Sequence, residues 1–271
     1  MKIRSITICL LLSAMFFSCK KDDLSEVGGP GNKYVPKLSK ILLNNESSVE
    51  FQYNDSNMVK AEKSKFDYTA HQYNSTGQLI SSTIYGNDDV LSNDNSVYQT
   101  AMSQTMWVTP ASGKKCGDIA YEYNSDGLLI KAVSSRPQSQ FSEFSEFSYD
   151  SGKRITKQTL YWENVASGYV DYQYDSKGNL TSEMLYNITS DGKTELMSDL
   201  KYAFDNEPNP LKTNKATIPG ISTNTNNILK ETLTIHLASG QPDKTEITEN
   251  SYKYNALGYP ISKNGNITYV Y

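Results

Sequence analysis

The stretch Tyr172-Gln173-Tyr174-Asp175-Ser176-Lys177-Gly178 carries the pattern that decides the fold of this 271-residue chain. One residue separates its two tyrosines, so in a β-strand both rings lie on the same face. The Asp side chain can accept a hydrogen bond from the backbone two residues on, and Gly178 can adopt the positive φ that completes a reversal. The stretch therefore predicts the end of a strand and the turn of a β-hairpin.

Six further stretches repeat this pattern. Each has an aromatic residue followed by Asn or Asp, usually with Gly two or three residues later, and these residues are Asn54, Asn74, Asn124, Asp150, Asp205 and Asn255. With Asp175 included, the intervals are 20, 50, 26, 25, 30 and 50 residues. They indicate a unit of about 25 residues that is skipped or degenerate near residues 100 and 230. Asn264-Gly265 predicts one more reversal, of type I′.

The chain is therefore expected to be all-β. Thr, Ser, Asn and Tyr favour strands and turns, and residues 207–227 are expected to be loop or extended edge. About eight hairpins in one chain form an antiparallel meander, which either closes on itself or leaves two exposed edges. We expect a closed or nearly closed barrel. The alternative is an open, twisted, single-layer sheet.

The N-terminal segment predicts export. Lys2 and Arg4 precede a run of about twelve mostly apolar residues at 6–17, which is too short to span a bilayer. Residues 13–19, Ser-Ala-Met-Phe-Phe-Ser-Cys, resemble a lipobox, although Phe16 stands where that motif usually has Leu. The resemblance implies cleavage before Cys19 and lipid on its thiol. The alternative is ordinary secretion with Cys19 free or discarded.

Three segments follow from this interpretation. Residues 1–18 are expected to be a lipoprotein signal peptide, 19–33 a lipidated flexible tether rich in Gly, Ser and charge, and 34–271 a single all-β repeat domain. Lys20-Lys21-Asp22-Asp23 looks like the export signals that place some lipoproteins on the outer face of the outer membrane. Removing residues 1–18 takes away two positive charges, so the net charge falls from −4 to −6. An acidic chain without basic clusters is not expected to bind nucleic acid.

Two resemblances follow from the quoted residues. The Tyr-x-Tyr-Asp/Asn-x-x-Gly phrase is similar to the YD repeats of very large secreted shell-forming toxins. Residues 201–210 and 251–260 resemble an uncharacterised bacterial lipoprotein family with a porin-like fold, over roughly residues 34–271. The second resemblance implies a porin-like barrel for this chain. The matching motifs are structural turns, so they carry over no catalytic residue.

The sequence shows no catalytic constellation, cofactor motif or metal-ligand spacing. His71 and His236 are expected to be solvent-side strand residues, and Cys116 is the only cysteine left after Cys19. Asp88-Asp89 and Asn93-Asp94-Asn95 offer oxygen ligands for calcium, but they lack the spacing of a calcium loop and are expected to form a polar hairpin tip. We therefore expect a protein that is not an enzyme and that has no cofactor.

Aromatic residues are the remaining candidates for ligand binding. The chain has twenty tyrosines, and their place in the repeat predicts that most are core residues or cross-strand pairs. Trp107 and Trp162 lie outside the repeated phrase, so they are the candidate ligand-binding residues.

The expected function is that of a non-enzymatic, lipid-anchored cell-surface protein, a binding or scaffold module whose ligand is a glycan or another envelope component. The first alternative is an outer-membrane barrel or pore component. Ile267-x-Tyr269-x-Tyr271 resembles the C-terminal sorting signal of such barrels, whereas the mean hydropathy of −0.56 argues against a lipid-facing surface. The second alternative is a hydrolase with a dispersed site.

Overall fold

The computed structural model describes residues 35–86, 107–137, 139, 142–213, 218–237 and 241–271. Pro36–Tyr271 forms one compact unit, to which the following description applies. The predicted signal peptide, tether and Cys19, and the acidic stretches at 88–89 and 93–95, lie outside the described residues.

The described residues form seventeen β-strands and two short 3-10 helices, and they contain no α-helix. The strands and 3-10 helices are β1 (Lys40–Leu43), β2 (Glu46–Tyr53), β3 (Val59–Ser64), β4 (Asp67–Tyr73), β5 (Leu79–Gly86), β6 (Lys114–Tyr123), β7 (Leu129–Ser135), β8 (Glu143–Tyr149), β9 (Ile155–Trp162), β10 (Val165–Tyr174), β11 (Leu180–Ile188), β12 (Thr194–Pro208), η2 (Pro210–Thr213), η3 (Ile221–Thr223), β13 (Asn226–Ile235), β14 (Lys244–Glu249), β15 (Tyr252–Tyr254), β16 (Pro260–Lys263) and β17 (Ile267–Val270). The predicted all-β class is confirmed.

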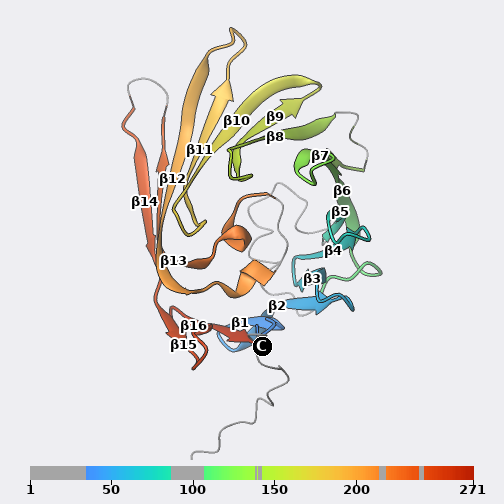
Figure 1. The fold of residues 1–271 in the computed structure, drawn as a ribbon, viewed down its shortest axis with the longest axis vertical. Coiled ribbons are helices and arrows are strands. Elements are labelled where there is room, and N and C mark those ends of the chain that lie inside the picture. Colours follow the sequence, from blue (N-terminus) through green and yellow to red (C-terminus); the bar gives the residue numbers. More distant parts are fainter. Residues whose placement is uncertain (1–34, 87–106, 138, 140–141, 214–217, 238–240) are drawn as a thin grey trace, which may run out of the picture. The chain divides into compact units, whose positions relative to one another are not determined.

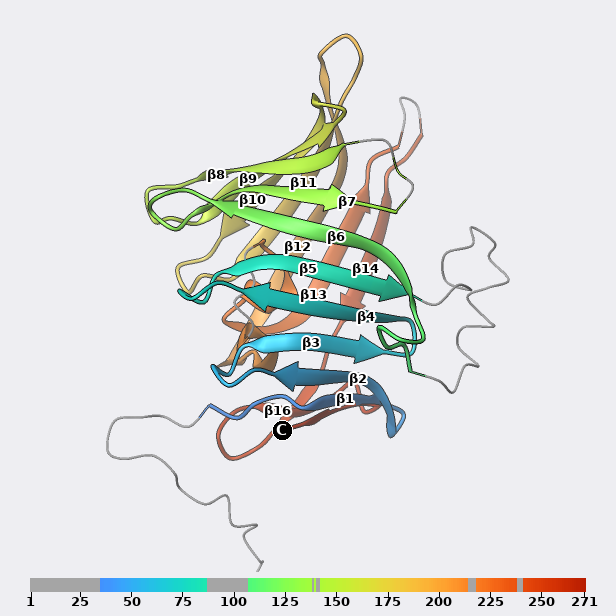
Figure 2. The ribbon, with the colours of Figure 1, turned by 90° about the vertical axis from the view of Figure 1, so that its right-hand side faces the viewer.

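The strands form one antiparallel sheet in which neighbours in sequence are neighbours in space (Figures 1 and 2). The sheet curls so far that β1 pairs with β17 as well as with β2. Pairing therefore runs from β15 through β16, β17 and β1, and then in chain order from β2 to β14. The predicted antiparallel meander is confirmed.

The predicted fold was a closed or nearly closed barrel, and closure is wrong, because the sheet has two edges, β14 and β15. Among the described strands, β14 pairs only with β13, and β15 only with β16. The alternative of an open sheet fits better. The two edges are consecutive in the chain: Asn250 donates its backbone N–H to Leu229 O (2.7 Å) and its side chain to Ile228 O (3.0 Å), and the chain then leaves β13 to pair with β16.

The repeated phrase forms the predicted turns. In six of the seven, the side-chain oxygen of Asn or Asp accepts the N–H groups two and four residues on, as Asn124 does from Asp126 (3.0 Å) and Leu128 (2.9 Å). The third residue after it has a positive φ, at Asn57, Gly77, Gly127, Lys153, Gly178 and Gly258. The turns join β2–β3, β4–β5, β6–β7, β8–β9, β10–β11 and β15–β16. They lie at one end of the strands, which we call the turn rim, and Figure 2 shows three of them aligned at its left.

Two details of the turn prediction need correction. In the fourth turn the residue with positive φ is Lys153 (61°) rather than Gly152. An L-residue in this region costs roughly 1–2 kcal/mol relative to right-handed backbone. The reversal at Asn264-Gly265 is confirmed, and both residues have positive φ, but Lys263 pairs with Ile267, so the loop has three residues instead of two.

The long intervals in the repeat are insertions, so the prediction of skipped units is wrong. Between Asn74 and Asn124 the chain forms β5 and β6, which pair directly although residues 87–113 separate them. The seventh turn, at Asp205, is opened by residues 208–225, which we call the insert. Asp205 Oδ1 still accepts Glu207 N (2.9 Å), but its second bond comes from Asn227 N (3.0 Å), beyond the insert.

Tyrosine hydroxyls connect one hairpin to the next at the turn rim. The β7–β8 ladder runs only from Ser134↔Glu143 to Lys131↔Glu146, and beyond it Tyr149 OH donates to Leu129 O at 2.7 Å. The same bond, 2.7–2.8 Å long, joins Tyr53 to Leu38, Tyr73 to Val59, Tyr123 to Leu79, Tyr174 to Ile155 and Tyr271 to Pro260. The acceptors include some of the most buried residues, such as Val59, Leu129 and Ile155. These hydroxyls therefore satisfy carbonyls that the ladder to the next hairpin does not reach.

We expect Tyr149→Phe to lower the free energy of unfolding by about 1–3 kcal/mol, because it leaves the carbonyl of buried Leu129 without its donor. Tyr169→Phe is the matched control, since this hydroxyl has no hydrogen-bond partner within the described residues and its ring stacks on Tyr186. Urea denaturation measures both. Equal losses in the two variants would contradict the role of the Tyr149 hydroxyl.

Candidate functional site

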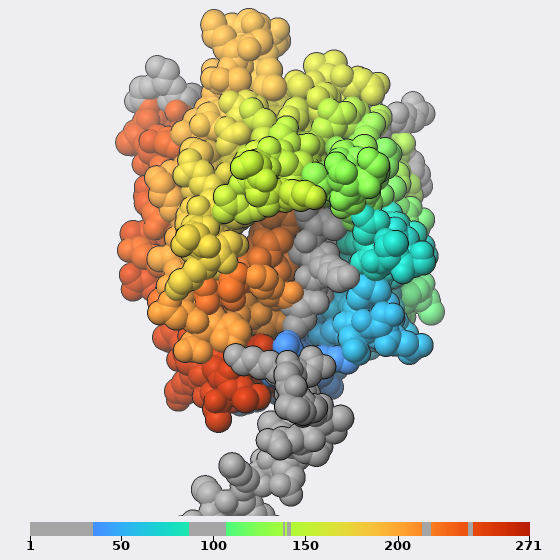
Figure 3. Space-filling view, viewed as in Figure 1, coloured from blue at the N-terminus to red at the C-terminus, as the bar shows by residue number. Residues whose placement is uncertain are grey.

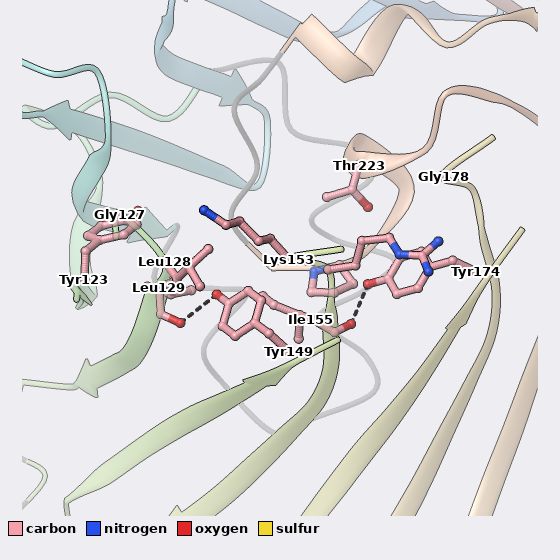
Figure 4. Close-up of a pocket in the computed structure, with 12 residues that line it drawn as sticks. Tyr123, Gly127, Leu128, Leu129, Tyr149, Lys153, Ile155, Tyr174, Gly178 and Thr223 are labelled. Atoms are coloured by element: carbon pink, nitrogen blue, oxygen red, sulfur yellow. Dashed lines mark hydrogen bonds between the residues drawn. The ribbon is translucent and has the colours of Figure 1, made fainter. Parts of the chain in front are cut away.

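A pocket of about 360 Å³ lies where the turn rim meets the insert (Figure 4). The turns after β6, β8 and β10 supply most of its lining, and the insert supplies two residues. The lining residues are Tyr123, Gly127, Leu128, Leu129, Tyr149, Lys153, Arg154, Ile155, Tyr174, Gly178, Pro219 and Thr223. Figure 3 shows this face of the unit hollowed between residues coloured yellow-green and residues coloured orange. We call this the rim pocket.

The aromatic part of the rim pocket is Tyr123, Tyr149 and Tyr174, the last tyrosines of three successive repeats. Figure 4 shows the hydroxyls of Tyr149 and Tyr174 bonded to the carbonyls of Leu129 and Ile155. Burial raises the pKa of both phenols above its ordinary value, so they are neutral at physiological pH. Their hydroxyls are used in holding the sheet, and the rings remain as apolar contact surface for a ligand.

Buried amide side chains fix the insert against the neighbouring turn. Asn179 accepts the N–H groups of Thr225 (2.8 Å) and Asn226 (2.9 Å), and Asn209 donates to Ile221 O (2.7 Å) and Asn224 O (3.1 Å). Phe204 stands where other repeats have the bonding tyrosine, so it offers no hydroxyl to the Leu180 carbonyl. The Leu180 N–H donates to the Asn224 side-chain oxygen of the insert at 2.7 Å.

The packing of the insert against the neighbouring turn was not predicted from the sequence. Residues 207–227 are expected from the sequence to be loop or extended edge, and most of the described ones are irregular, with β12 ending at Pro208 and β13 beginning at Asn226. Buried amides of the kind found at Asn179 and Asn224 need partners, and the six Asn at positions 206–227 were the available signal. Nothing in the sequence shows which turn those partners belong to.

Two cations line the rim pocket, and they differ in their partners. Arg154 is held by Asp150, with Nε and Nη2 each 2.8 Å from Oδ2, and its guanidinium lies 5.2 Å from the centre of the Tyr174 ring. The hydrogen bond from the Arg154 N–H lowers the pKa of Asp150, which keeps this carboxylate ionised. Lys153 has no ion-pair partner in the described part of the chain, and Figure 4 shows its ammonium on the Leu128 side of the pocket.

The structure does not bring the two predicted ligand-binding tryptophans together. Trp107 lies beside β3, with the Lys63 ammonium 5.1 Å from its ring, whereas Trp162 ends β9, six strands along the sheet, and is 43% exposed. Neither lines the rim pocket or a second, polar pocket of about 650 Å³ at the turns after β2 and β4. A ligand role for Trp107 and Trp162 stays a prediction, as does lipid attachment at Cys19.

His71 is not the solvent-side residue expected from the sequence. Its side chain is 13% exposed, its Nδ1 lies 2.9 Å from Ser82 Oγ, and its Nε2 lies 3.6 Å from the Glu62 carboxylate. This is the order acid, histidine, serine of a nucleophilic triad. Ser82, however, is 2% exposed and lines neither pocket. The cluster is therefore a structural hydrogen-bond network, which continues to Tyr121 OH at 3.4 Å from Ser82.

His236 also has a specific partner. Its Nδ1 lies 2.8 Å from Asp243 Oδ2, and its side chain is 28% exposed. Within the described residues, no group of three or more His, Cys, Asp or Glu side chains is arranged to hold a metal ion, and Cys116 is a free thiol.

Glu183 of β11 is a carboxylate with a raised pKa, and it lies on the face of the sheet that carries the core tyrosines. Burial raises its pKa, while the hydrogen bond donated by Tyr202 OH (2.6 Å) opposes the rise. A carboxyl whose pKa is higher in the folded than in the unfolded protein contributes stability below the unfolded pKa, and that contribution is lost as the pH rises through the folded pKa.

We therefore expect Glu183→Gln, which keeps an acceptor for Tyr202, to be more stable than the wild type at pH 7. The difference in the free energy of unfolding between variant and wild type should shrink as the pH falls below the ordinary pKa of a glutamate, because Glu183 is then neutral as well. Glu246→Gln on exposed β14 is the control. Urea melts at pH 7 and pH 4 measure the effect, and an advantage that grows toward low pH would contradict it.

No protein-family model matches the chain, and no curated protein matches it. Among solved structures, the chain is similar to a porin-like protein from Bacteroides uniformis, with 14% identity, a TM-score of 0.41, and coverage of 88% of this chain and 98% of that one. A porin-like protein from Bacteroides vulgatus has 11% identity, a TM-score of 0.38, and coverage of 87% and 99%.

The chain is also similar to part of TcdB2-TccC3, with 14% identity and a TM-score of 0.30, over 75% of this chain and 10% of that one. The similar solved structures thus include two proteins described as porin-like, whereas no lipoprotein family or YD-repeat family is identified.

Proposed function

We propose that this protein is a lipid-anchored envelope protein, facing the cell exterior, that binds a saccharide in the rim pocket and does not change it chemically. The observation that carries the proposal is the composition of that pocket. Three tyrosine rings and the side chains of Leu128, Leu129 and Ile155 offer apolar contact, and Lys153 offers a donor. Rigid rings with one or two polar groups at the edge suit sugar rings, which have an apolar face and hydroxyls around it.

Two further observations support binding over catalysis. The phenols in the pocket have raised pKa values and donate to backbone carbonyls, so they are poor proton acceptors at neutral pH. The twelve lining residues include no carboxylate, cysteine or histidine. The proposed membrane anchoring and outer-membrane location rest on the N-terminal sequence. The proposed glycan ligand rests on the chemistry of the pocket.

The alternative, an outer-membrane barrel or pore component, is less consistent with the sheet. An open sheet edge leaves backbone N–H and C=O groups without partners, which hydrocarbon does not tolerate. β14 is such an edge, and all six of its residues, Lys244 to Glu249, are exposed. No helix in the described residues has both the length and the apolar character needed to cross a membrane.

The binding proposal is tested on glycan arrays and in polysaccharide pull-downs with the purified full-length chain. We expect saccharide binding that Leu128→Trp weakens about tenfold or more, because the larger side chain fills the pocket. Leu257→Trp, at an exposed position of another turn, is the matched control and should leave binding unchanged. An array without any bound glycan would overturn the proposal, and so would equal loss in both variants.

A further inference from the structure

Lys153 occupies a backbone position that favours glycine. Its φ is 61°, and the equivalent residues of four other turns are Gly77, Gly127, Gly178 and Gly258. A lysine there is strained in a way that glycine is not. The neighbouring Gly152 does not take up the positive φ. Backbone strain of this kind points to a role for the side chain that the position carries.

The side chain of Lys153 lines the rim pocket, and its ammonium has no ion-pair partner within the described residues. Arg154, the other cation of the lining, is bonded to Asp150 and lies 3.4 Å from the carbonyl oxygen of Asp175. The hydroxyl of Thr223 donates to Gly220 O at 2.8 Å. Among the described lining side chains, Lys153 is therefore the cation that has no ion-pair partner and is free to meet an anionic ligand.

We propose that Lys153 makes the rim pocket selective for acidic saccharides, sugar rings that carry a carboxylate or a sulfate. This inference rests on the saccharide-binding function proposed above and names its ligand class. The ammonium of Lys153 donates to the anionic oxygens, and the rings of Tyr149 and Tyr174 contact the sugar. A hydrogen bond between charged groups is stronger than one between neutral groups, so one lysine is enough to set the preference.

The first test is an array of neutral, carboxylated and sulfated glycans, probed with the full-length chain. We expect the acidic glycans to be bound in preference to neutral ones of the same size, and the two acidic groups separate carboxylate from sulfate as the anion. If only neutral glycans are bound, the inference is overturned while the saccharide-binding function stands. If no glycan is bound, both are overturned.

The second test compares Lys153→Met with Lys244→Met, which removes the same charge from exposed β14. Two pairs of probes are used. The carboxylated probe is the trimer of galacturonic acid, and its methyl ester is the neutral counterpart. The sulfated probe is galactose 6-sulfate, and galactose is the neutral counterpart. We expect Lys153→Met to weaken binding of the preferred acidic probe about tenfold and to leave its neutral counterpart unchanged. Equal weakening by Lys244→Met would show an effect of net charge alone and would overturn the inference.

Lys153→Gly separates the role in binding from a role in folding. Glycine relieves the strain of the positive φ, so this variant should unfold at a higher urea concentration than the wild type while losing the preference for acidic glycans. A less stable variant would mean that Lys153 holds the turn. A variant that keeps the preference would mean that another group recognises the anion. Either result would overturn the inference.

Discussion

The fold depends on how backbone groups are satisfied at the turn rim. There the ladders between hairpins stop short of the turns, as the β3–β4 ladder stops at Ala61↔Ala70. In five of the seven repeats, two side chains compensate for this. The Asn or Asp accepts two N–H groups within its own turn, and the tyrosine before it donates to a backbone carbonyl of the preceding segment, as Asn74 and Tyr73 do. Each of these hairpins is thus closed by one residue and joined to its neighbour by the residue before it.

This arrangement explains how the sheet accommodates an insertion. Asp205 keeps both hydrogen bonds of the turn although its second partner, Asn227, lies 22 residues away in sequence. Because both hydrogen bonds survive, β12 and β13 pair as other hairpins do, and the insert can fold against the turn at Asp175. Pro219 and Thr223 of the insert complete the lining of the rim pocket.

The sequence predicted what is local to the repeat. Turn positions, strand class and antiparallel order follow from an aromatic residue, an Asn or Asp and a residue with positive φ at fixed spacing, and they are confirmed at six turns. Closure of the sheet is not local. It depends on the partners of β14 and β15, and the chain passes from one edge to the other just after Asn250, which makes the last backbone bond to β13.

The site was hard to predict for the same reason. The tyrosines were correctly assigned to the structure, but three of them also line the rim pocket, so a structural role did not exclude contact with a ligand. Nothing in the sequence pointed to Lys153. Its backbone has a positive φ, and the sequence suggested that the neighbouring Gly152 would supply the positive φ of this turn. His71 was placed on the wrong side although it stands two residues before Tyr73 in β4 and so shares the face of that tyrosine. Its partner Ser82 could not be predicted, because that pairing depends on a bulge in β5.

Amide hydrogen exchange at the turn rim tests the central claim most directly. The amides of Leu128, Arg154 and Asn179 lie at the ends of turns, where exchange is ordinarily fast, yet each donates to the Asn or Asp side chain of its own turn. Our account predicts that they exchange as slowly as amides in the middle of β10 and β11. Exchange as fast as that of exposed loop amides would contradict it.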